Sequence, residues 1–384
     1  MPLFAACAAA MAVFGLALAL PGAAFGVDEV RVRLALDVAV QARLIATLFF
    51  GFFASTLVAG PLSDHVGRRQ VLVLSCTLLA AGLGLFGVAE GPDAALAAML
   101  LLGLGASGVN TVANTIAADL FPARRGAMLT WLALSSGVGG ASLPFLALAG
   151  GRVSWTAVLW GAAAVAAVAG GAAAAMTFPP HTGGREPLTP ARVRQVLAAP
   201  GFVWFVLALA CQGGNEASLA GWLTAYLGSR GLSSSAALAT LGLHWVAIIA
   251  SRVVAGLVIE RVGVRAVIVS GAATASAGTL LLVTSSTPPA LVASAVVAGL
   301  GISSVFSAVL AAAGDRYPRQ MGTMYGVLLA GAQLGGMTLP WGVGQIAGAR
   351  GLDAGLTLVV VTTAAVGVLM WRPAGPGRRP DTGR

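Results

Sequence analysis

The sequence predicts an all-α integral membrane protein in which twelve transmembrane helices form two six-helix bundles. Three observations support this fold class: long apolar runs, arginines sorted between alternate loops, and residues that recur at a fixed offset. The chain of 384 residues is 58% hydrophobic and only 9% charged, and its mean hydropathy is +0.91. Charged residues make up about 25% of a typical soluble domain, so an aqueous fold is excluded.

Apolar runs that are long enough to span a bilayer recur along the chain. A transmembrane helix needs about 20 predominantly apolar residues to cross the hydrocarbon core. The first run ends in small residues at Pro21–Ala24, as a cleaved secretory signal does, but no basic segment precedes it, so we expect a retained helix. The twelve expected helices are 3–25, 41–62, 70–89, 93–117, 127–150, 153–178, 201–227, 236–258, 265–284, 288–312, 323–348 and 353–371.

The net charge of +9 has two possible explanations, a nucleic-acid partner or a membrane topology. All 22 basic residues are arginine, and 15 of them fall in the termini and even-numbered loops together with 6 acids. The odd-numbered loops hold 6 arginines and 6 acids, so the whole excess lies on one side. The positive-inside rule makes this side cytoplasmic. We therefore expect a multi-pass protein of the plasma (inner) membrane with both termini in the cytoplasm and no nucleic-acid partner.

An internal repeat relates the two halves of the chain. Ser55–Arg69 and Ser251–Arg265 lie 196 residues apart, and their glycines, one acid and the final arginine coincide. One duplicated six-helix unit explains this match, and parallel repeats of this kind place a transport site between two bundles near the middle of the membrane. The same offset aligns Asp119, Pro122, Gly126, Met128 and Pro144 with Asp315, Pro318, Gly322, Met324 and Pro340.

The repeat also sets the expected domain boundaries. A polar stretch that carries several Pro and Gly residues lies between the halves, as a linker between two bundles would. We expect an N-terminal six-helix bundle at 1–178, a cytoplasmic linker at 179–200, a C-terminal six-helix bundle at 201–372 and a cytoplasmic tail at 373–384.

The loop Gly60–Arg69, with the sequence GPLSDHVGRR, resembles the loop pattern G-x-L-x-D-R-x-G-R-R of the major facilitator superfamily (MFS), with His65 in place of the first basic residue. This resemblance implies the MFS fold, with its two pseudo-symmetric six-helix bundles. Gly214–Glu216 followed by Gly221–Leu227 is similar to helix 7 of the fucose/glucose:proton symporter family. Further stretches that agree with that family are Asn114–Pro122, Gly126, Gly137–Gly139 and Gly314–Pro318.

Gating residues are expected in this loop and in its repeat mate. Small glycines let helices approach closely, and Asp64 is expected to face the start of the eleventh helix near Gly322, a favourable place for an anion. Breaking that contact would favour an outward-open state. In the second copy Val264 replaces the first arginine of the pair, which suggests a weaker contact. The expected gating residues are Gly60, Asp64, Gly67, Arg68, Arg69, Glu260 and Arg265.

Glu216 is expected near the centre of the seventh helix, where an ionised acid costs about 2.5–3.5 kcal/mol on insertion scales. One hypothesis makes it a protonatable group that faces a central cavity and couples proton and solute movement. The alternative is a hydrogen-bonded acid that ties helices together. Gly213 and Gly214 beside it favour the first hypothesis, because irregular backbone at this depth lines cavities.

Polar side chains within the expected helices are candidates for contacts with a sugar-like solute. The three asparagines of the chain all fall inside expected helices, where an amide has to find partners. Contacts that only join helices are the alternative for each of them. His244 is expected to reach the cavity or simply to pack, and Arg252 to anchor at the interface or to pair with solute or acid. The expected substrate-binding residues are Asn110, Asn114, Gln212, Asn215, Trp222, Gln333 and Trp341.

These features favour a secondary active transporter of a small polar, sugar-like solute that works by alternating access with proton coupling. An MFS exporter of drugs or metabolites is the alternative, and Leu143 before Pro144 disfavours it because such exporters typically carry a Gly-Pro step there. The fucose-family resemblance also implies coupling acids in the first helix and inside the fourth, and neither place holds one, since Asp93 stands only at the start of the fourth helix; altered coupling or facilitated diffusion therefore stays open.

Other classes of protein fit the sequence less well. No loop is long enough for a soluble catalytic domain. A glycine-rich phosphate-binding loop with its lysine is excluded, because the chain has no lysine. A channel is disfavoured because a single deep acid suits alternating access better than a ring of charges. We therefore expect no enzyme activity, no catalytic residues, no cofactor and no metal. The expected partners are the solute, a proton and the lipid bilayer, with the protein as a monomer.

Overall fold

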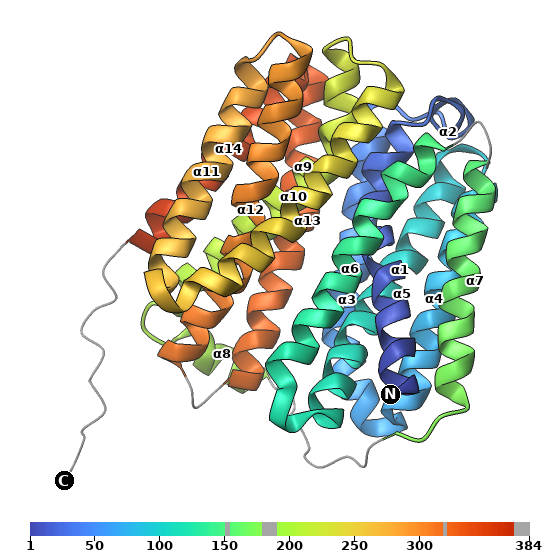
Figure 1. The fold of residues 1–384 in the computed structure, drawn as a ribbon, viewed down its shortest axis with the longest axis vertical. Coiled ribbons are helices and arrows are strands. Elements are labelled where there is room, and N and C mark those ends of the chain that lie inside the picture. Colours follow the sequence, from blue (N-terminus) through green and yellow to red (C-terminus); the bar gives the residue numbers. More distant parts are fainter. Residues whose placement is uncertain (150–153, 179–189, 318–320, 372–384) are drawn as a thin grey trace.

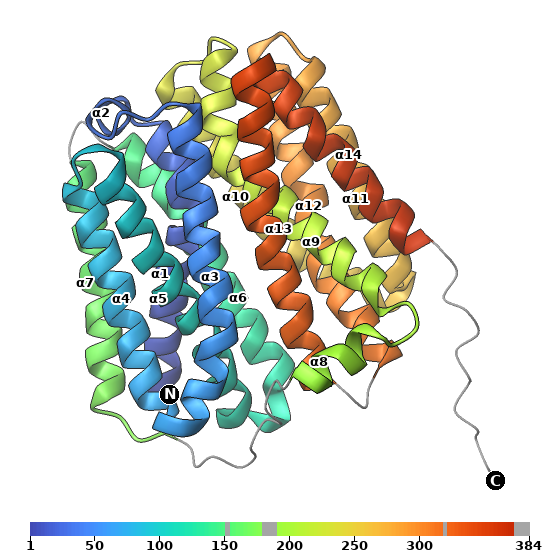
Figure 2. The same ribbon diagram turned by 180° about the vertical axis from the view of Figure 1, so that it is seen from behind.

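The computed structural model describes residues 1–149, 154–178, 190–317 and 321–371. Within these ranges the chain is helical, and two bundles of long helices lie side by side (Figures 1 and 2). The short helix α2 (Asp28–Arg33) lies at one end of the bundles and the short helix α8 (Pro190–Leu197) at the other. We call these two ends the α2 side and the α8 side.

The N-terminal bundle holds six long helices, and a 3₁₀ turn, η1 (Pro122–Arg124), precedes the fifth of them. Each of the six is long and apolar enough to cross a membrane. They are α1 (Pro2–Phe25), α3 (Val38–Val66), α4 (Arg68–Val88), α5 (Gly91–Leu120), α6 (Arg125–Leu148) and α7 (Trp155–Ala174).

The C-terminal bundle also holds six long helices. Four of them meet the same criteria for length and apolarity, and α9 forms a further span together with α8, to which it is joined at a bend of 94°. The 30-residue α13 packs along α9 and α3 and completes a set of twelve transmembrane helices. The six helices are α9 (Phe202–Ser229), α10 (Ser234–Val262), α11 (Val264–Thr284), α12 (Pro288–Arg316), α13 (Met321–Arg350) and α14 (Leu352–Trp371).

The helix boundaries repeat at the offset found in the sequence. The first residues of α3 and α10 lie 196 positions apart in the sequence, and so do their last residues. The same holds for α4 and α11. Both α3 and α10 are capped by a side chain, because Asp37 accepts from the Val40 amide and Ser233 accepts from the Ala236 amide. A single glycine with positive φ then joins each of these helices to the next, which a side chain at that position would strain.

The two bundles touch each other on the α2 side through aromatic rings that lie against glycines. A β-carbon placed on Gly336 of α13 would lie 2.2 Å from the Phe49 ring of α3. A β-carbon placed on Gly140 of α6 would lie 2.7 Å from the Trp245 ring of α10. These two contacts are repeat mates, since the same offset separates the two aromatic residues and the two glycines. The contact between bundles on this side therefore follows the pseudo-symmetry of the chain.

Hydrogen bonds reinforce this contact. The buried Gln41 of α3 donates to the Gly221 carbonyl of α9 at 2.5 Å, and Thr224 of α9 donates to the Gly22 carbonyl of α1. At the rim, the Ser234 hydroxyl donates to Asp28 at 3.0 Å. The α2 side is thus held closed by packing and by hydrogen bonds.

The same helices lie apart toward the α8 side. No atom lies within 4 Å of a β-carbon placed on Gly126 of α6 or on Gly256 of α10. On α10, Val254 and Leu257 are 56% and 72% exposed, whereas Trp245 two turns earlier is buried. The two bundles therefore touch on the α2 side and diverge toward the α8 side (Figures 1 and 2).

The expected helices are confirmed in number and order, and several of their ends differ. The second helix extends four residues beyond the expected 62, to Val66, and the sixth ends at Ala174 and not at 178. Helix α2 was not expected, because its six residues include four charged ones. The expected linker contains α8, and its first part, 179–189, lies outside the described residues together with the tail at 373–384.

Candidate functional site

Glu216 and Arg252 form an ion pair within the C-terminal bundle. Nη2 of Arg252 lies 3.1 Å from Oε1 of Glu216, and Nε of Arg252 donates to the Ser303 hydroxyl at 2.6 Å. The three residues belong to α9, α10 and α12, so this contact joins three helices. Glu216 is near the midpoint of the 28-residue α9, and Arg252 lies ten residues before the end of α10, about 15 Å by helical rise. Charges at such depth usually mark a functional site.

The ion pair lies where the contact between the two bundles ends. On α10, Ile249 packs against a glycine of α6, and Arg252 follows it by three residues on the same helix face. On α9, the Ala220 carbonyl approaches Gly22 of α1 closely, and Glu216 lies one turn nearer the α8 side. The Arg252 and Glu216 side chains are 26% and 18% exposed, so both are accessible.

The N-terminal bundle has neutral residues at the equivalent positions. Thr56 and Ser107, the repeat mates of Arg252 and Ser303, share a hydrogen bond of 2.9 Å. Leu18 is the equivalent of Glu216, because the first helix of each half packs in the same way. Gly15 approaches the carbonyl of Ser136 as Gly213 approaches the carbonyl of Ala332, the repeat mate of Ser136. The ion pair is thus a feature of one half only.

Asn110 and Asn114 lie on α5 of the opposite bundle and are half-buried. The Asn114 amide donates to the Asn110 side-chain oxygen at 2.9 Å and to its carbonyl at 2.7 Å. Within the described part of the chain, the amide nitrogen of Asn110 donates no hydrogen bond to a protein atom. Both asparagines stay predicted substrate-binding residues.

Three of the predicted substrate-binding residues are buried and bonded to neighbouring helices. Gln212 donates to the Ile302 carbonyl of α12, Trp222 donates to the Pro340 carbonyl of α13 at 3.1 Å, and Asn215 accepts from Thr362 of α14. All three are at most 1% exposed. The structure therefore gives the side chains of Gln212, Asn215 and Trp222 hydrogen-bond partners inside the C-terminal bundle, and none of these bonds is to Glu216 or Arg252.

The other predicted residues lie in different surroundings. Gln333 of α13 is half-buried, and Trp341 is 49% exposed. His244 is fully buried, and its Nδ1 lies 2.8 Å from the Ala295 carbonyl of α12. It therefore packs within the C-terminal bundle, two turns along α10 from Arg252.

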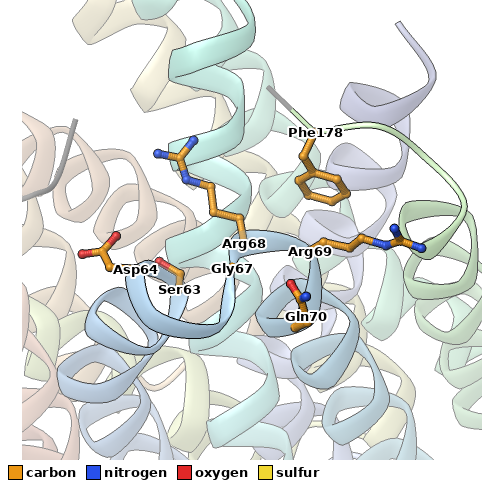
Figure 3. A pocket seen from close by; sticks show the side chains of 7 residues that line it. All are labelled: Ser63, Asp64, Gly67, Arg68, Arg69, Gln70 and Phe178. Atoms are coloured by element: carbon orange, nitrogen blue, oxygen red, sulfur yellow. The ribbon is translucent and has the colours of Figure 1, made fainter. Parts of the chain in front are cut away.

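The predicted gating loop forms the turn between α3 and α4 on the α8 side. Gly67 has φ of +97°, and Arg68 forms an ion pair with Asp119 of α5, which ties the loop to the N-terminal bundle. Gly60 has no atom near a β-carbon position. The contact expected between Asp64 and α13 near Gly322 involves residues 321–322, whose side chains lie outside the described ones, so it stays a prediction. Figure 3 shows the pocket at this turn, which Ser63, Asp64, Gly67, Arg68, Arg69, Gln70 and Phe178 line.

The second copy of this loop makes different contacts. Val264 occupies the position of Arg68, so the ion pair of the first copy has no equivalent there. Arg265 instead donates to the Trp371 carbonyl and stacks 5.0 Å from the centre of the Trp371 ring. Glu260 is exposed. The second loop is thus held to α14, whereas the first is held to α5.

Ser303 is the site residue that sequence reasoning missed. A serine in an apolar helix is common and carries no indication by itself. The repeat offers one, because Ser303 is the mate of Ser107, and the residues that these serines contact, Arg252 and Thr56, are mates as well.

Solved structures of several transporters share this architecture. A D-xylose–proton symporter matches with a TM-score of 0.77 at 15% identity, over 94% of this chain and 96% of that one. A bacterial homologue of the human lysosomal transporter Spinster, in an inward-facing and unoccupied conformation, matches with a TM-score of 0.78 at 15% identity, over 95% of each chain. The nucleoside transporter NupG matches with a TM-score of 0.75 at 13% identity, over 96% and 97%. At these identities the similarity concerns the fold.

Curated relatives match over short segments. The inner membrane metabolite transport protein YgcS of Escherichia coli is 34% identical over 80 residues, 21% of this chain and 18% of the relative. The MFS-type efflux transporter ffsH of Aspergillus flavipes is 34% identical over 88 residues, 23% of this chain and 16% of the relative. Each match thus spans under a fifth of the relative's length.

A family model covers nearly the whole chain. The model for the Major Facilitator Superfamily matches residues 3–258 and again 236–384. This match agrees with the twelve helices, with the two bundles related by an internal repeat and with the loop at Gly60–Arg69. The chain therefore belongs to the major facilitator superfamily of transporters.

Proposed function

We propose that this protein is a secondary active transporter that moves a small polar, sugar-like solute by alternating access, with Glu216 as the proton-binding group. The observation that carries the proposal is the Glu216–Arg252 ion pair, which lies at the point where contact between the bundles ends. Proton coupling in a carrier requires a group that changes charge and is reachable from water, and a partly exposed carboxylate at mid-membrane depth meets both requirements.

The α8 side is cytoplasmic in this proposal. The arginine-bearing turns after α3 and α10 lie on that side together with α8, as the positive-inside rule requires for cytoplasmic segments. The bundles touch on the α2 side and diverge toward the α8 side, so the conformation is inward-facing. Moving the bundles about the ion pair would open the α2 side and give the other half of the transport cycle.

Export is the second candidate function. One curated relative is described as an efflux transporter, and another as a metabolite transport protein. The Leu143–Pro144 step of α6 still favours import, because the Gly-Pro step typical of export antiporters is missing.

Uptake into proteoliposomes tests the proposal. A panel of labelled sugars and related polar solutes is offered under an imposed proton gradient, with wild type, Glu216→Gln and the control Glu29→Gln, whose acid is exposed on α2. We expect one solute to accumulate against its gradient in wild type and control. In Glu216→Gln we expect exchange of that solute to continue while accumulation is lost. Accumulation that survives Glu216→Gln would show that Glu216 is not the proton-coupling group. Release of preloaded solute from the vesicles when the proton gradient is reversed would favour export.

A further inference from the structure

We propose that the transported solute carries a carboxylate and that this carboxylate binds Arg252 in place of Glu216. The substrate class is then a hydroxylated carboxylic acid, such as a sugar acid. The sugar-like part of this inference rests on the function proposed above, and the acidic part rests on the contacts of Arg252.

Arg252 has the capacity to bind an anion. A guanidinium offers five N–H donors in a planar fork that matches a carboxylate. Among the described residues its contacts are one to Glu216 and one to Ser303, so donors remain. A single contact of 3.1 Å to Glu216 is weaker than the two parallel bonds that an arginine forms with a well-placed carboxylate. Arg252 is therefore paired, but incompletely.

The position of Arg252 makes the exchange of partners possible. Its side chain is 26% exposed, and it lies on the α10 face that turns to α6, one turn beyond the Ile249 contact. The helices diverge from this point toward the α8 side, so a solute from that side reaches Arg252 without first separating the bundles. The Ser303 hydroxyl accepts a hydrogen bond from Nε at 2.6 Å, which restrains the orientation of the guanidinium.

The exchange conserves charge within the site. The solute carboxylate takes the contact with Arg252, and Glu216, now without its cation, takes up one proton from water and becomes neutral. On release of the solute, Glu216 loses that proton and pairs with Arg252 again. An ionised carboxylate left unpaired at this depth would be costly, so the two events are linked.

A structural role for the ion pair is the competing explanation, and the chain provides a variant that separates the two. Glu216→Leu combined with Arg252→Thr gives the C-terminal half the residues of the N-terminal half, Leu18 and Thr56. The double variant leaves no unpaired charge, and the threonine retains a hydroxyl for Ser303, as Thr56 has for Ser107. It is therefore expected to fold while it lacks the cation.

The test compares gluconate with glucose, which differ in the carboxylate, by binding to purified protein and by uptake into proteoliposomes. We expect wild type to bind gluconate. Both Arg252→Gln and the double variant should bind it at least about tenfold more weakly, because a charge-assisted hydrogen bond is lost. Arg252→Lys should recover part of the affinity. Glu216→Gln should bind gluconate at least as tightly as wild type, because the competing carboxylate is gone.

Two outcomes would overturn this inference. Glucose binding that equals or exceeds gluconate binding, and that Arg252→Gln leaves unchanged, would refute the carboxylate while leaving a proton-coupled sugar transporter intact. Binding of neither compound, in a protein that the fluorescence of its tryptophans shows to be folded, would refute the sugar-acid class. Gluconate binding that depends on Arg252, without proton-driven accumulation, would support the carboxylate site at Arg252 and refute both the proton coupling proposed above and the linked proton uptake by Glu216.

Discussion

The two halves of this transporter share a backbone plan and differ in where their charges lie. In the N-terminal half, Arg68 and Asp119 form an ion pair at the α8 side, and the interior holds the neutral pair Thr56 and Ser107. In the C-terminal half, the interior holds Glu216 with Arg252. Its peripheral loop has Val264 at the position of Arg68. These two ion pairs thus lie at different depths in the two halves.

This difference separates the framework from the chemistry. Helix lengths, caps and glycine turns recur at the same offset in both halves, because both have to pack and to span the same bilayer. A charge pair at mid-membrane depth adds nothing to that requirement and costs desolvation. We infer from its presence in one half only that the C-terminal half supplies the charged groups for proton and solute, while Asn110 and Asn114 of the N-terminal half stay candidates for neutral contacts with the solute.

The largest expected effect comes from replacing one member of the ion pair by the residue of the other half. Arg252→Thr alone or Glu216→Leu alone leaves one charge unpaired, which should lower the free energy of unfolding by about 2–3 kcal/mol, less than a fully buried pair would because water reaches both side chains. The double variant should be more stable than either single variant. Thermal unfolding in detergent measures this. Additive losses would show that the two charges do not interact.

A smaller effect is expected at the two symmetric contacts between bundles. Gly140→Ala or Gly336→Ala pushes the Trp245 or Phe49 ring away and should open the α2 side. A cysteine introduced by Ile45→Cys reports on this opening, because Ile45 is buried in the contact. An impermeant maleimide should label that cysteine several-fold faster when either glycine is replaced than when both are present.

Gly161→Ala is the matched control for this experiment, since no atom lies within 4 Å of its β-carbon position. Equal acceleration by the two glycine variants would mean that both halves contribute equally to closure. Acceleration by only one of them would break the symmetry of the contact.

The smallest effect is expected at the helix caps, where the halves should behave identically. Asp37→Ala and Ser233→Ala each remove a side chain that accepts from a backbone amide at a helix start. Each should cost about 1 kcal/mol of stability. Hydrogen exchange at the first turns of α3 and α10 measures the loss, and a change at one helix only would contradict their equivalence.

Much of the fold was predictable because it depends on composition and on periodic sequence features. The apolar runs predicted twelve helices in the right order, and the repeat offset predicted the pairing of the halves, down to the glycines at 67 and 263. Helix ends were less predictable. The second helix continues through Pro61 to Val66, since its last turns extend beyond the hydrocarbon core, where polar residues are tolerated.

The site was predictable only in part, because the direction of each side chain depends on helix rotation. Glu216 stood out as a deep acid, yet Asn215 beside it points to Thr362 of α14, inside the bundle. A helix that is apolar on every side gives no face to orient it, unlike an amphipathic helix in water. The pairing of Arg252 was left open for the same reason, and it became evident once α9, α10 and α12 were placed together.

The pairing of Glu216 with Arg252 also has a consequence for the response to membrane voltage. Moving one unit charge across the membrane changes its free energy by about 2.3 kcal/mol for every 100 mV of membrane potential. The site is neutral when the two residues pair, and it is neutral again when a solute anion binds Arg252 and Glu216 carries a proton. Solute accumulation should then follow the pH gradient and not the electrical potential, whereas a carrier with Glu216→Gln would take a net charge through the field.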